Sequence, residues 1–122
     1  GEMKRALISL VLWFSMLNPA LADVDKISDY LDRYENGPKE TRERVEFGIG
    51  EAADAFAWAN TSREYDGYSL SYCPPPHISL DAQGYMGVFL SYLSDNEQFL
   101  DEPSNIRNFI LLLALKRSFP CE

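Results

Sequence analysis

Apolar residues recur at helical spacing along most of this chain. The first stripe has the spacing i, i+3, i+4 and i+7 that one helix face gives. It consists of Ile27, Tyr30, Leu31 and Tyr34. Asn36-Gly37-Pro38 predicts the end of this helix, because Gly37 suits a left-handed cap and Pro38 does not continue a helix. A second helix is predicted from about Glu40 to Asn60, with an inner face of Val45, Ile49, Ala52, Ala53 and Phe56.

Two more helices follow in the C-terminal half. The third is predicted to begin after Ser79 as N-cap, with Asp81 in the first turn. Its core stripe is Tyr85, Val88, Phe89, Tyr92 and Leu93. The fourth begins at Pro103, which suits a first turn, and it is apolar nearly all round. Such a helix is central or lies against a second subunit. The pattern therefore predicts an all-α fold, a small single-domain bundle of about four helices.

Glycines and one carboxylate interrupt the apolar pattern inside these helices. A glycine weakens a helix by about 1 kcal/mol relative to Ala. We therefore expect Gly48 and Gly50 in the second helix, and Gly84 and Gly87 in the third, to mark close approach of a neighbour. Asp54 stands among alanines beside the inner face, so we expect it to be half-buried and to cap or bridge to a neighbouring helix.

The first 22 residues have the order of a secretory signal peptide. Lys4-Arg5 is followed by an almost wholly apolar run to Leu17, and Ala20-Leu21-Ala22 places small residues before a cut after Ala22. A membrane anchor needs about 20 apolar residues, and this run is shorter. The alternative is a buried N-terminal helix. We predict a signal peptide over 1–22, including the two residues that precede Met3, and one exported domain over 23–122 that does not stay on the membrane.

Acidic residues dominate the charge of the chain. It has 11 Lys and Arg against 19 Asp and Glu, a net charge of −8. Without Glu2, Lys4 and Arg5 of the predicted signal peptide, 9 basic and 18 acidic residues remain, a charge of −9. Such a charge repels nucleic acid and anionic lipid. It suits a basic protein partner, or it serves solubility alone.

The sequence contains two cysteines, Cys73 and Cys121. In an exported protein two cysteines predict one disulfide. The bond would close a loop of 49 residues, counting both ends. The chain-entropy model gives a stabilisation of about 4 kcal/mol for such a loop.

Residues 61–76 form the longest stretch without a helical pattern. Thr61, Ser62, Gly67 and the run of three prolines all disfavour a helix there. Loops of this length in compact domains are often functional.

This stretch also gathers tyrosines and carboxylates. Tyrosines supply large contact areas at low entropy cost and are enriched in binding hot spots. The predicted partner contacts are Glu64, Tyr65, Asp66 and Tyr68, with the acidic turn 95–102 as second choice. The alternative is that Tyr65, Tyr68 and Tyr72 fold back on the bundle.

No arrangement of residues in the sequence supports catalysis or metal ligation. His77 is the only histidine. With both cysteines in a disulfide, it has no free thiol to activate as a nucleophile. No second Cys/His pair is present to complete a tetrahedral metal site. Serine-nucleophile and phosphate-loop motifs are absent. The carboxylate pairs Glu43/Glu46 and Asp95/Glu97 are interpreted as a solvated acidic face. We therefore expect a binding protein and no enzyme, with no cofactor and no metal.

Three segments resemble the small periplasmic immunity proteins of bacterial type VI secretion, the Rap/Tai family. They are the Gly- and Ala-containing stretch 48–56, the motif Cys73-Pro74-Pro75, and the stretch 113–121 that ends in Phe119-Pro120-Cys121. Together with the predicted signal peptide, the resemblance covers most of 40–122. Many relatives carry a second cysteine pair on the first two helices, which this chain lacks.

The resemblance implies an all-α periplasmic protein that inhibits a peptidoglycan amidase injected by sibling cells, by occluding its active-site cleft. It also implies that Cys73 and Cys121 form the family's disulfide and that the chain dimerises. A homodimer is favoured separately by Leu111, Leu112 and Leu115 on the far side of the fourth helix. The alternatives are a periplasmic chaperone-like or structural binding protein without an enzyme target, and an enzyme acting on cell-wall sugar through acidic residues.

Overall fold

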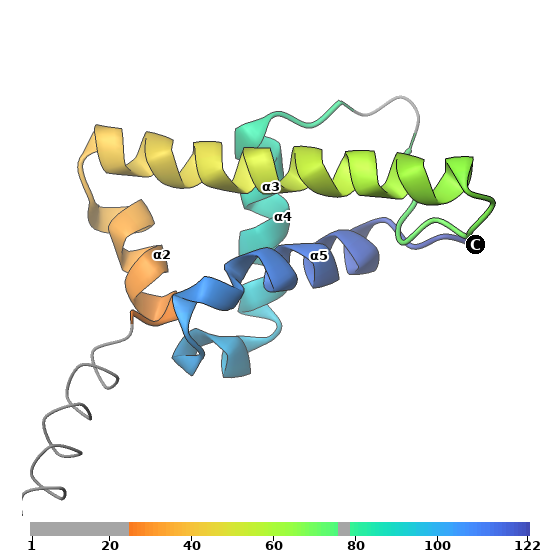
Figure 1. Cartoon of the computed structure of the whole chain (residues 1–122). Coiled ribbons are helices and arrows are strands. Elements are labelled where there is room, and N and C mark those ends of the chain that lie inside the picture. Colours follow the sequence, from red (N-terminus) through yellow and green to blue (C-terminus); the bar gives the residue numbers. More distant parts are fainter. Residues whose placement is uncertain (1–24, 76–78) are drawn as a thin grey trace, which may run out of the picture.

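The computed structural model describes residues 25–75 and 79–122 (Figure 1). These residues form four α-helices, named α2 (Ile27–Asn36), α3 (Lys39–Tyr65), α4 (Ala82–Ser94) and α5 (Arg107–Ser118). Two 3-10 helices, η1 (Glu97–Asp101) and η2 (Ser104–Ile106), connect α4 to α5. Within these ranges the only pairing of the β type is an isolated bridge between Lys26 and Pro103. The all-α bundle prediction is confirmed, whereas the predicted signal peptide 1–22 lies outside the described residues.

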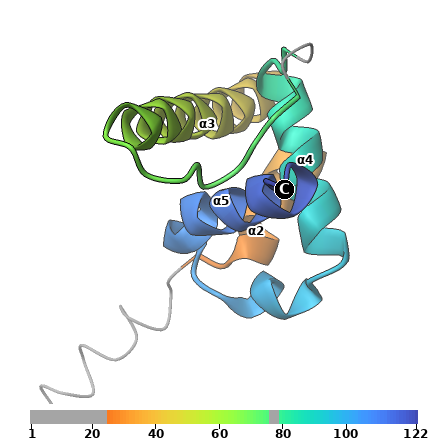
Figure 2. The same ribbon diagram turned by 90° about the vertical axis from the view of Figure 1, so that its right-hand side faces the viewer.

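The longest helix, α3, lies across one side of the molecule. The α4 helix runs steeply across the middle of α3, and α2 packs against its N-terminal half (Figure 1). The view turned by 90° shows that the segment after α3 runs back between α3 and the C-terminal end of α5 (Figure 2). This return segment carries Cys73, so it places the cysteine beside the end of α5.

Each α-helix contributes one face to a single core. The buried apolar residues of the helices are Ile27, Tyr30, Val45, Ile49, Ala53, Met86, Phe89, Leu93, Ile110, Leu111, Ala114 and Leu115. The Tyr30 ring meets the Phe89 ring edge-on, with their centroids 6.2 Å apart. The predicted inner faces all contribute to this core, but Met86 was missed. Half of the predicted residues are only partly buried, namely Leu31, Tyr34, Ala52, Phe56, Tyr85, Val88 and Tyr92.

The α5 helix is the central one. Its residues Ile110, Leu111 and Leu115 are completely buried against the other helices of the same chain, as the all-round apolar pattern of this helix predicted. Leu112 is partly buried against the same core. Two of the leucines that favoured a homodimer, Leu111 and Leu115, therefore pack inside their own chain, and the homodimer itself stays a prediction.

Three predicted helix ends are wrong by several residues. The α3 helix continues to Tyr65 instead of ending at Asn60, so 61–65 belong to a helix, and the Thr61 hydroxyl donates a hydrogen bond to the Ala57 carbonyl one turn earlier. The cap of α4 is Asp81, whose Oδ1 accepts from the Gly84 amide at 2.8 Å. Pro103 precedes η2, and α5 begins four residues later, at Arg107.

The left-handed position lies at Gly67 and not at Gly37. Gly67 has φ +83° in the turn after α3, a conformation that other residues rarely adopt. Gly37 has φ −79°, so its predicted left-handed cap is wrong. Its lack of a side chain is still required, because a Cβ there would collide with the Arg33 carbonyl oxygen.

Close helix approach is confirmed at only part of the glycines. A Cβ built on Gly50 would lie 3.2 Å from the Cβ of Ala82, so α3 and α4 touch there. At Gly84 the nearest atom is 3.0 Å away and belongs to the segment before α4. Gly48 and Gly87 face open space, with nothing within 4 Å of a built Cβ, so the expectation is wrong for these two.

Candidate functional site

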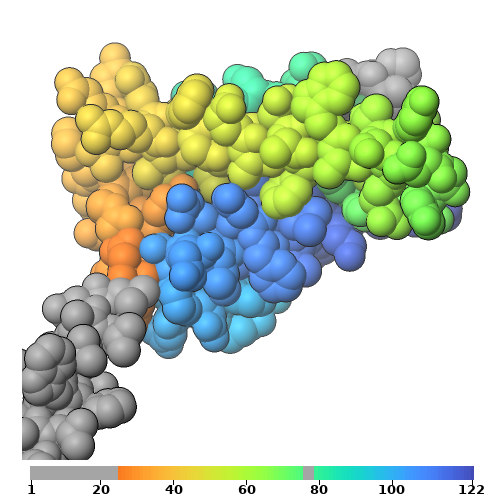
Figure 3. Space-filling view, in the orientation of Figure 1, coloured from red at the N-terminus to blue at the C-terminus, as the bar shows by residue number. Residues whose placement is uncertain are grey.

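The end of α3 and the turn after it, residues 63–68, form a projection that we call the tip. Tyr65 is 91 % exposed and Tyr68 is 65 % exposed, and Glu64 and Asp66 are also exposed. The structure thus brings together, on the surface, all four residues that the sequence predicted as partner contacts. In the space-filling view this part of the chain forms one extremity of the molecule (Figure 3).

Backbone and side-chain contacts give the tip a fixed shape. The amide of Tyr68 donates to the Arg63 carbonyl at 2.8 Å and the amide of Gly67 donates to the Glu64 carbonyl at 3.0 Å. The Arg63 Nε donates to the Ser69 carbonyl at 2.8 Å, and the Arg63 guanidinium lies over the Tyr68 ring, 5.7 Å from its centroid. The ring of Tyr68 is therefore covered on one face by a cation, whereas no such contact from the described residues covers the ring of Tyr65.

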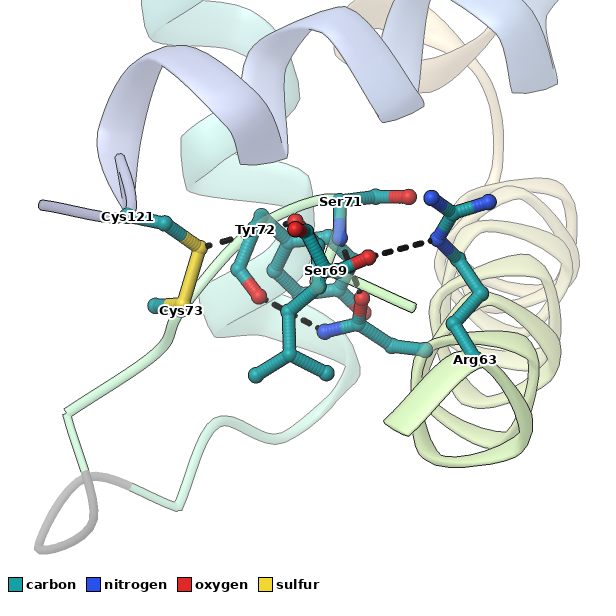
Figure 4. The surroundings of a disulfide bond; sticks show 8 residues. Arg63, Ser69, Ser71, Tyr72, Cys73 and Cys121 are labelled. Atoms are coloured by element: carbon teal, nitrogen blue, oxygen red, sulfur yellow. Dashed lines mark hydrogen bonds between the residues drawn. A yellow bond between two sulfur atoms is a disulfide. The ribbon is translucent and has the colours of Figure 1, made fainter. Parts of the chain in front are cut away.

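A buried amide ties the return segment to α3. Asn60 is 7 % exposed, and no other polar or charged side chain in the described ranges is buried. Its Nδ2 donates to the Tyr72 carbonyl at 2.6 Å, and its Oδ1 accepts from the Ser71 amide at 2.7 Å (Figure 4). We call this pair of hydrogen bonds the clasp.

Tyr72 behaves differently from the two tyrosines of the tip. It is 3 % exposed and packs in the core, and this burial raises the pKa of its phenol. The two interpretations of the tyrosines, as partner contacts or as residues folded back on the bundle, therefore apply to different residues: Tyr65 and Tyr68 face solvent, and Tyr72 folds back.

The predicted disulfide between Cys73 and Cys121 is confirmed, with the two Cα atoms 5.0 Å apart. The Cys73 amide also donates to the Phe119 carbonyl at 2.8 Å, at the end of α5. Figure 4 shows the bond next to the clasp. The segment after the tip is thus fixed to α3 by the clasp and to α5 by a covalent bond.

A second exposed feature runs along α3 towards its N-terminal half. Phe47 is 66 % exposed and Trp58 is 69 % exposed. With about 3.6 residues per turn, Phe47, Glu51, Asp54 and Trp58 lie within about 60° of one another on the helix, opposite the core face. We call these four residues the outer stripe. Tyr65 of the tip comes two turns after Trp58 on the same face.

A shallow groove of about 360 Å³ accompanies the outer stripe. It lies where α4 begins beside α3, next to the close approach of Gly50 to Ala82. Its lining consists of Phe47, Gly50, Glu51, Asp54, Ala57, Leu80, Asp81, Ala82 and Tyr85. Asp54 is exposed on this groove, so the expectation that it is half-buried against a neighbouring helix is wrong.

The acidic turn 95–102 lies elsewhere. Its η1 helix sits at the side of the bundle away from α3 (Figure 1). Asp95 forms an ion pair with Arg117 at 2.8 Å, and the rings of Tyr92 and Phe99 pack at 6.1 Å. This turn is engaged in contacts of its own and does not join the tip or the outer stripe.

The sequence reasoning missed Phe47 and Trp58, although a signal for them was present. Both fall on the polar side of the predicted second helix, 11 residues or about three turns apart. Two large aromatic side chains on the face opposite an apolar stripe make that face a candidate contact surface.

Among the described residues, no three His, Cys, Asp or Glu side chains are grouped so that they could hold a metal ion, and His77 lies outside those residues. No described helix combines the length and the apolar character required to cross a membrane. Comparisons with protein-family models, with curated proteins and with solved structures find no match. The resemblance to the Rap/Tai family therefore stays a prediction.

Proposed function

We propose that this chain is a periplasmic immunity protein that binds and inhibits a peptidoglycan amidase effector of type VI secretion. The observation that carries the proposal is the tip, where two tyrosines and two carboxylates face solvent on a fixed projection. The resemblance of the cysteine motifs to the Rap/Tai family supplies the identity of the target. The disulfide supports an oxidising compartment such as the periplasm.

Inhibition by this chain needs no chemistry of its own. A convex tip that enters a concave substrate cleft excludes the substrate by occupying its volume. Tyr65 would provide most of the new buried area, because 91 % of its surface is available, and buried aromatic anchors dominate binding energy. Since the clasp and the disulfide hold the segment in place before binding, little ordering entropy is lost on association.

The negative charge supports the rate of association more than the final affinity. A charge of −9 on residues 23–122 attracts a basic enzyme over a Debye length of about 8 Å at physiological salt. We expect the association rate to fall steeply as salt is raised, with a smaller change in the dissociation rate. An association rate independent of salt would contradict the steering part of the proposal.

The test is protection of cells. A candidate amidase is directed to the periplasm together with this chain, either with residues 1–22 or without them, and lysis is followed by optical density. Protection by the exported form alone is the expected result. Lysis by this chain in the absence of the amidase would indicate an enzyme, and binding to many unfolded chains without selectivity would indicate a chaperone-like protein.

Two variants identify the contact surface. Tyr65→Ala combined with Tyr68→Ala should abolish protection and weaken binding to the amidase by at least about 30-fold, the loss expected for one hot spot. Phe109→Ala is the matched control, because Phe109 is 55 % exposed on α5, and it should leave protection intact. Equal effects of the two variants would refute the assignment of the tip.

A further inference from the structure

The aromatic rings of the outer stripe have no cation over them, unlike the rings of four tyrosines elsewhere in the described part of the chain. Arginine guanidinium groups lie 5.2–6.0 Å from the ring centroids of Tyr30, Tyr34, Tyr68 and Tyr92. No contact of this kind covers Phe47 or Trp58 within the described part of the chain. Two large rings on one face of α3 therefore meet solvent without an arginine side chain of the described ranges over them.

The carboxylates of the outer stripe are also without a cation. In the described ranges, the ion pairs involve Asp25, Glu43 and Asp95, and none involves Glu51 or Asp54. Residues three and four positions apart are neighbours on a helix surface. Along about 16 Å of helix, the outer stripe therefore consists of two carboxylates flanked by an aromatic ring at each end.

We infer that the outer stripe and its groove form a docking surface for a partner protein that presents arginine side chains. A guanidinium stacks on an aromatic face and at the same time forms paired hydrogen bonds with a carboxylate. The spacing of Trp58 and Asp54, one turn apart, offers both contacts to one arginine side chain. Lysine provides a point charge without the planar stacking surface, so arginine is the better match.

A second copy of this chain fits the surface less well. Two copies joined through α3 would bring Glu51 and Asp54 of each copy towards the same carboxylates of the other, with an overall charge of −8 on each chain. Arg44 lines a depression with Glu40, Glu43 and Phe47 at the N-terminal end of the stripe, so one cation stands there against the carboxylates of both helices. Charge complementarity therefore favours a basic partner over self-association.

The inference goes beyond the proposed function. It concerns a surface that begins about 10 Å from Tyr65 along α3, and it holds whether the partner is an amidase or another basic protein. If the partner is the amidase, the outer stripe is a second region of contact alongside the tip.

The experiment uses the full chain labelled with 15N and a probe of known composition. The probe is an amphipathic peptide of about 16 residues that alternates pairs of leucine and arginine, and a second peptide carries glutamate in place of arginine. We expect the arginine peptide to shift the amide signals of 47–58 and 80–85 and the indole signal of Trp58. The indole signal is assigned by its loss in Trp58→Phe.

Two variants that remove the same number of charges distinguish binding at the outer stripe from attraction by the net charge of the protein. Glu51→Gln with Asp54→Asn should weaken binding of the arginine peptide at least about tenfold, the size of one charge-assisted contact. Glu97→Gln with Asp101→Asn removes the same two charges from η1 and should change binding less than about threefold. Trp58→Ala should weaken binding by about tenfold, since a stacked cation is lost.

Several results would overturn the inference. Equal weakening by the two charge-matched pairs would mean that only the net charge attracts the peptide, and equal binding of the glutamate peptide would exclude arginine recognition. Shifts of the same residues with rising protein concentration and no peptide would assign the surface to a second copy. The Tyr65→Ala/Tyr68→Ala variant should bind the peptide normally, so a failure of cell protection leaves this test unaffected.

Discussion

Removing the side chain of Asn60 tests whether the clasp holds the return segment to α3. Asn60→Ala removes two hydrogen bonds, of 2.6 Å to the Tyr72 carbonyl and 2.7 Å from the Ser71 amide. Tyr72 is 3 % exposed, so its carbonyl loses a partner in a place with little water, which costs about 1–3 kcal/mol. Ser71 is exposed, so its amide is rehydrated and the loss there is about 0.5–1 kcal/mol.

The expected decrease in the free energy of unfolding is therefore about 1.5–4 kcal/mol. For a domain of this size each kcal/mol lowers the melting temperature by about 4–8 °C. Urea unfolding followed by circular dichroism measures the free energy, and hydrogen exchange measures the protection of the Ser71 amide directly. Both should fall together, because the same side chain supports stability and the local hydrogen bond.

Two variants control this experiment. Asn60→Asp keeps an acceptor for the Ser71 amide but places a carboxylate against the Tyr72 carbonyl, so it should also destabilise the protein. Asn108→Ala changes an exposed asparagine on α5 and should cost less than about 0.5 kcal/mol. If Asn60→Ala costs as little as Asn108→Ala, and the Ser71 amide exchanges as before, the clasp does not hold the segment and the reasoning is wrong.

Three further changes have directions that follow from the structure. Cys73→Ser with Cys121→Ser should lower the free energy of unfolding by about 4 kcal/mol, and a reducing agent should destabilise the parent protein but not this variant. Gly48→Ala should raise the free energy of unfolding by about 1 kcal/mol, because open space surrounds Gly48. Gly50→Ala should raise it less, because the added Cβ lies 3.2 Å from a methyl group at the start of α4. Thermal melts of the two variants measure the difference. The hydrogen bonds that Arg33 donates to Asp25 lower the pKa of the Asp25 carboxyl. The ion pair therefore stabilises the fold above the ordinary aspartyl pKa of 3.8, and this stabilisation is lost as pH falls through the lower pKa of the folded state. Asp25→Asn should accordingly cost less than about 1 kcal/mol at pH 7 and nothing at a pH where the parent carboxyl is protonated, as measured by urea unfolding at both pH values.

The helices were predictable because periodicity reports burial. Each predicted inner face contains residues that the structure buries, such as Ile49 in α3 and Phe89 in α4. Periodicity does not specify what covers an apolar helix. The pattern of α5 fitted either a central position or a second subunit, and only the tertiary arrangement, in which Leu111 and Leu115 are fully buried, distinguishes the two.

The helix ends were less predictable because local preferences are weak compared with tertiary contacts. Thr61 and Ser62 have modest helix propensities, yet both are inside α3. The Thr61 hydroxyl is satisfied within the helix, and Asn60 fixes the neighbouring turn through bonds to a segment 11 and 12 residues later. No local pattern in the sequence contains that long-range bond.

The candidate site was only partly predictable for a similar reason. The sequence identified Tyr65 and Tyr68 as a group with Tyr72, but a tyrosine in a loop can face solvent or core, and the backbone path after Gly67 decides which. The return of the chain buries Tyr72 and leaves the other two exposed. Trp58 was not predicted because a single large ring on the polar side of a helix leaves the apolar periodicity of the buried face unchanged.

The disulfide divides the molecule into parts that respond differently to mechanical tension. Cys73 and Cys121 are 48 positions apart, a stretch that would reach about 160 Å if fully extended. With the sulfur atoms joined, a force applied to the two ends passes from one cysteine directly to the other and bypasses α4 and α5. Only α2 and α3 would then be stretched in a single-molecule pulling experiment, and the remaining length would appear once the bond is reduced.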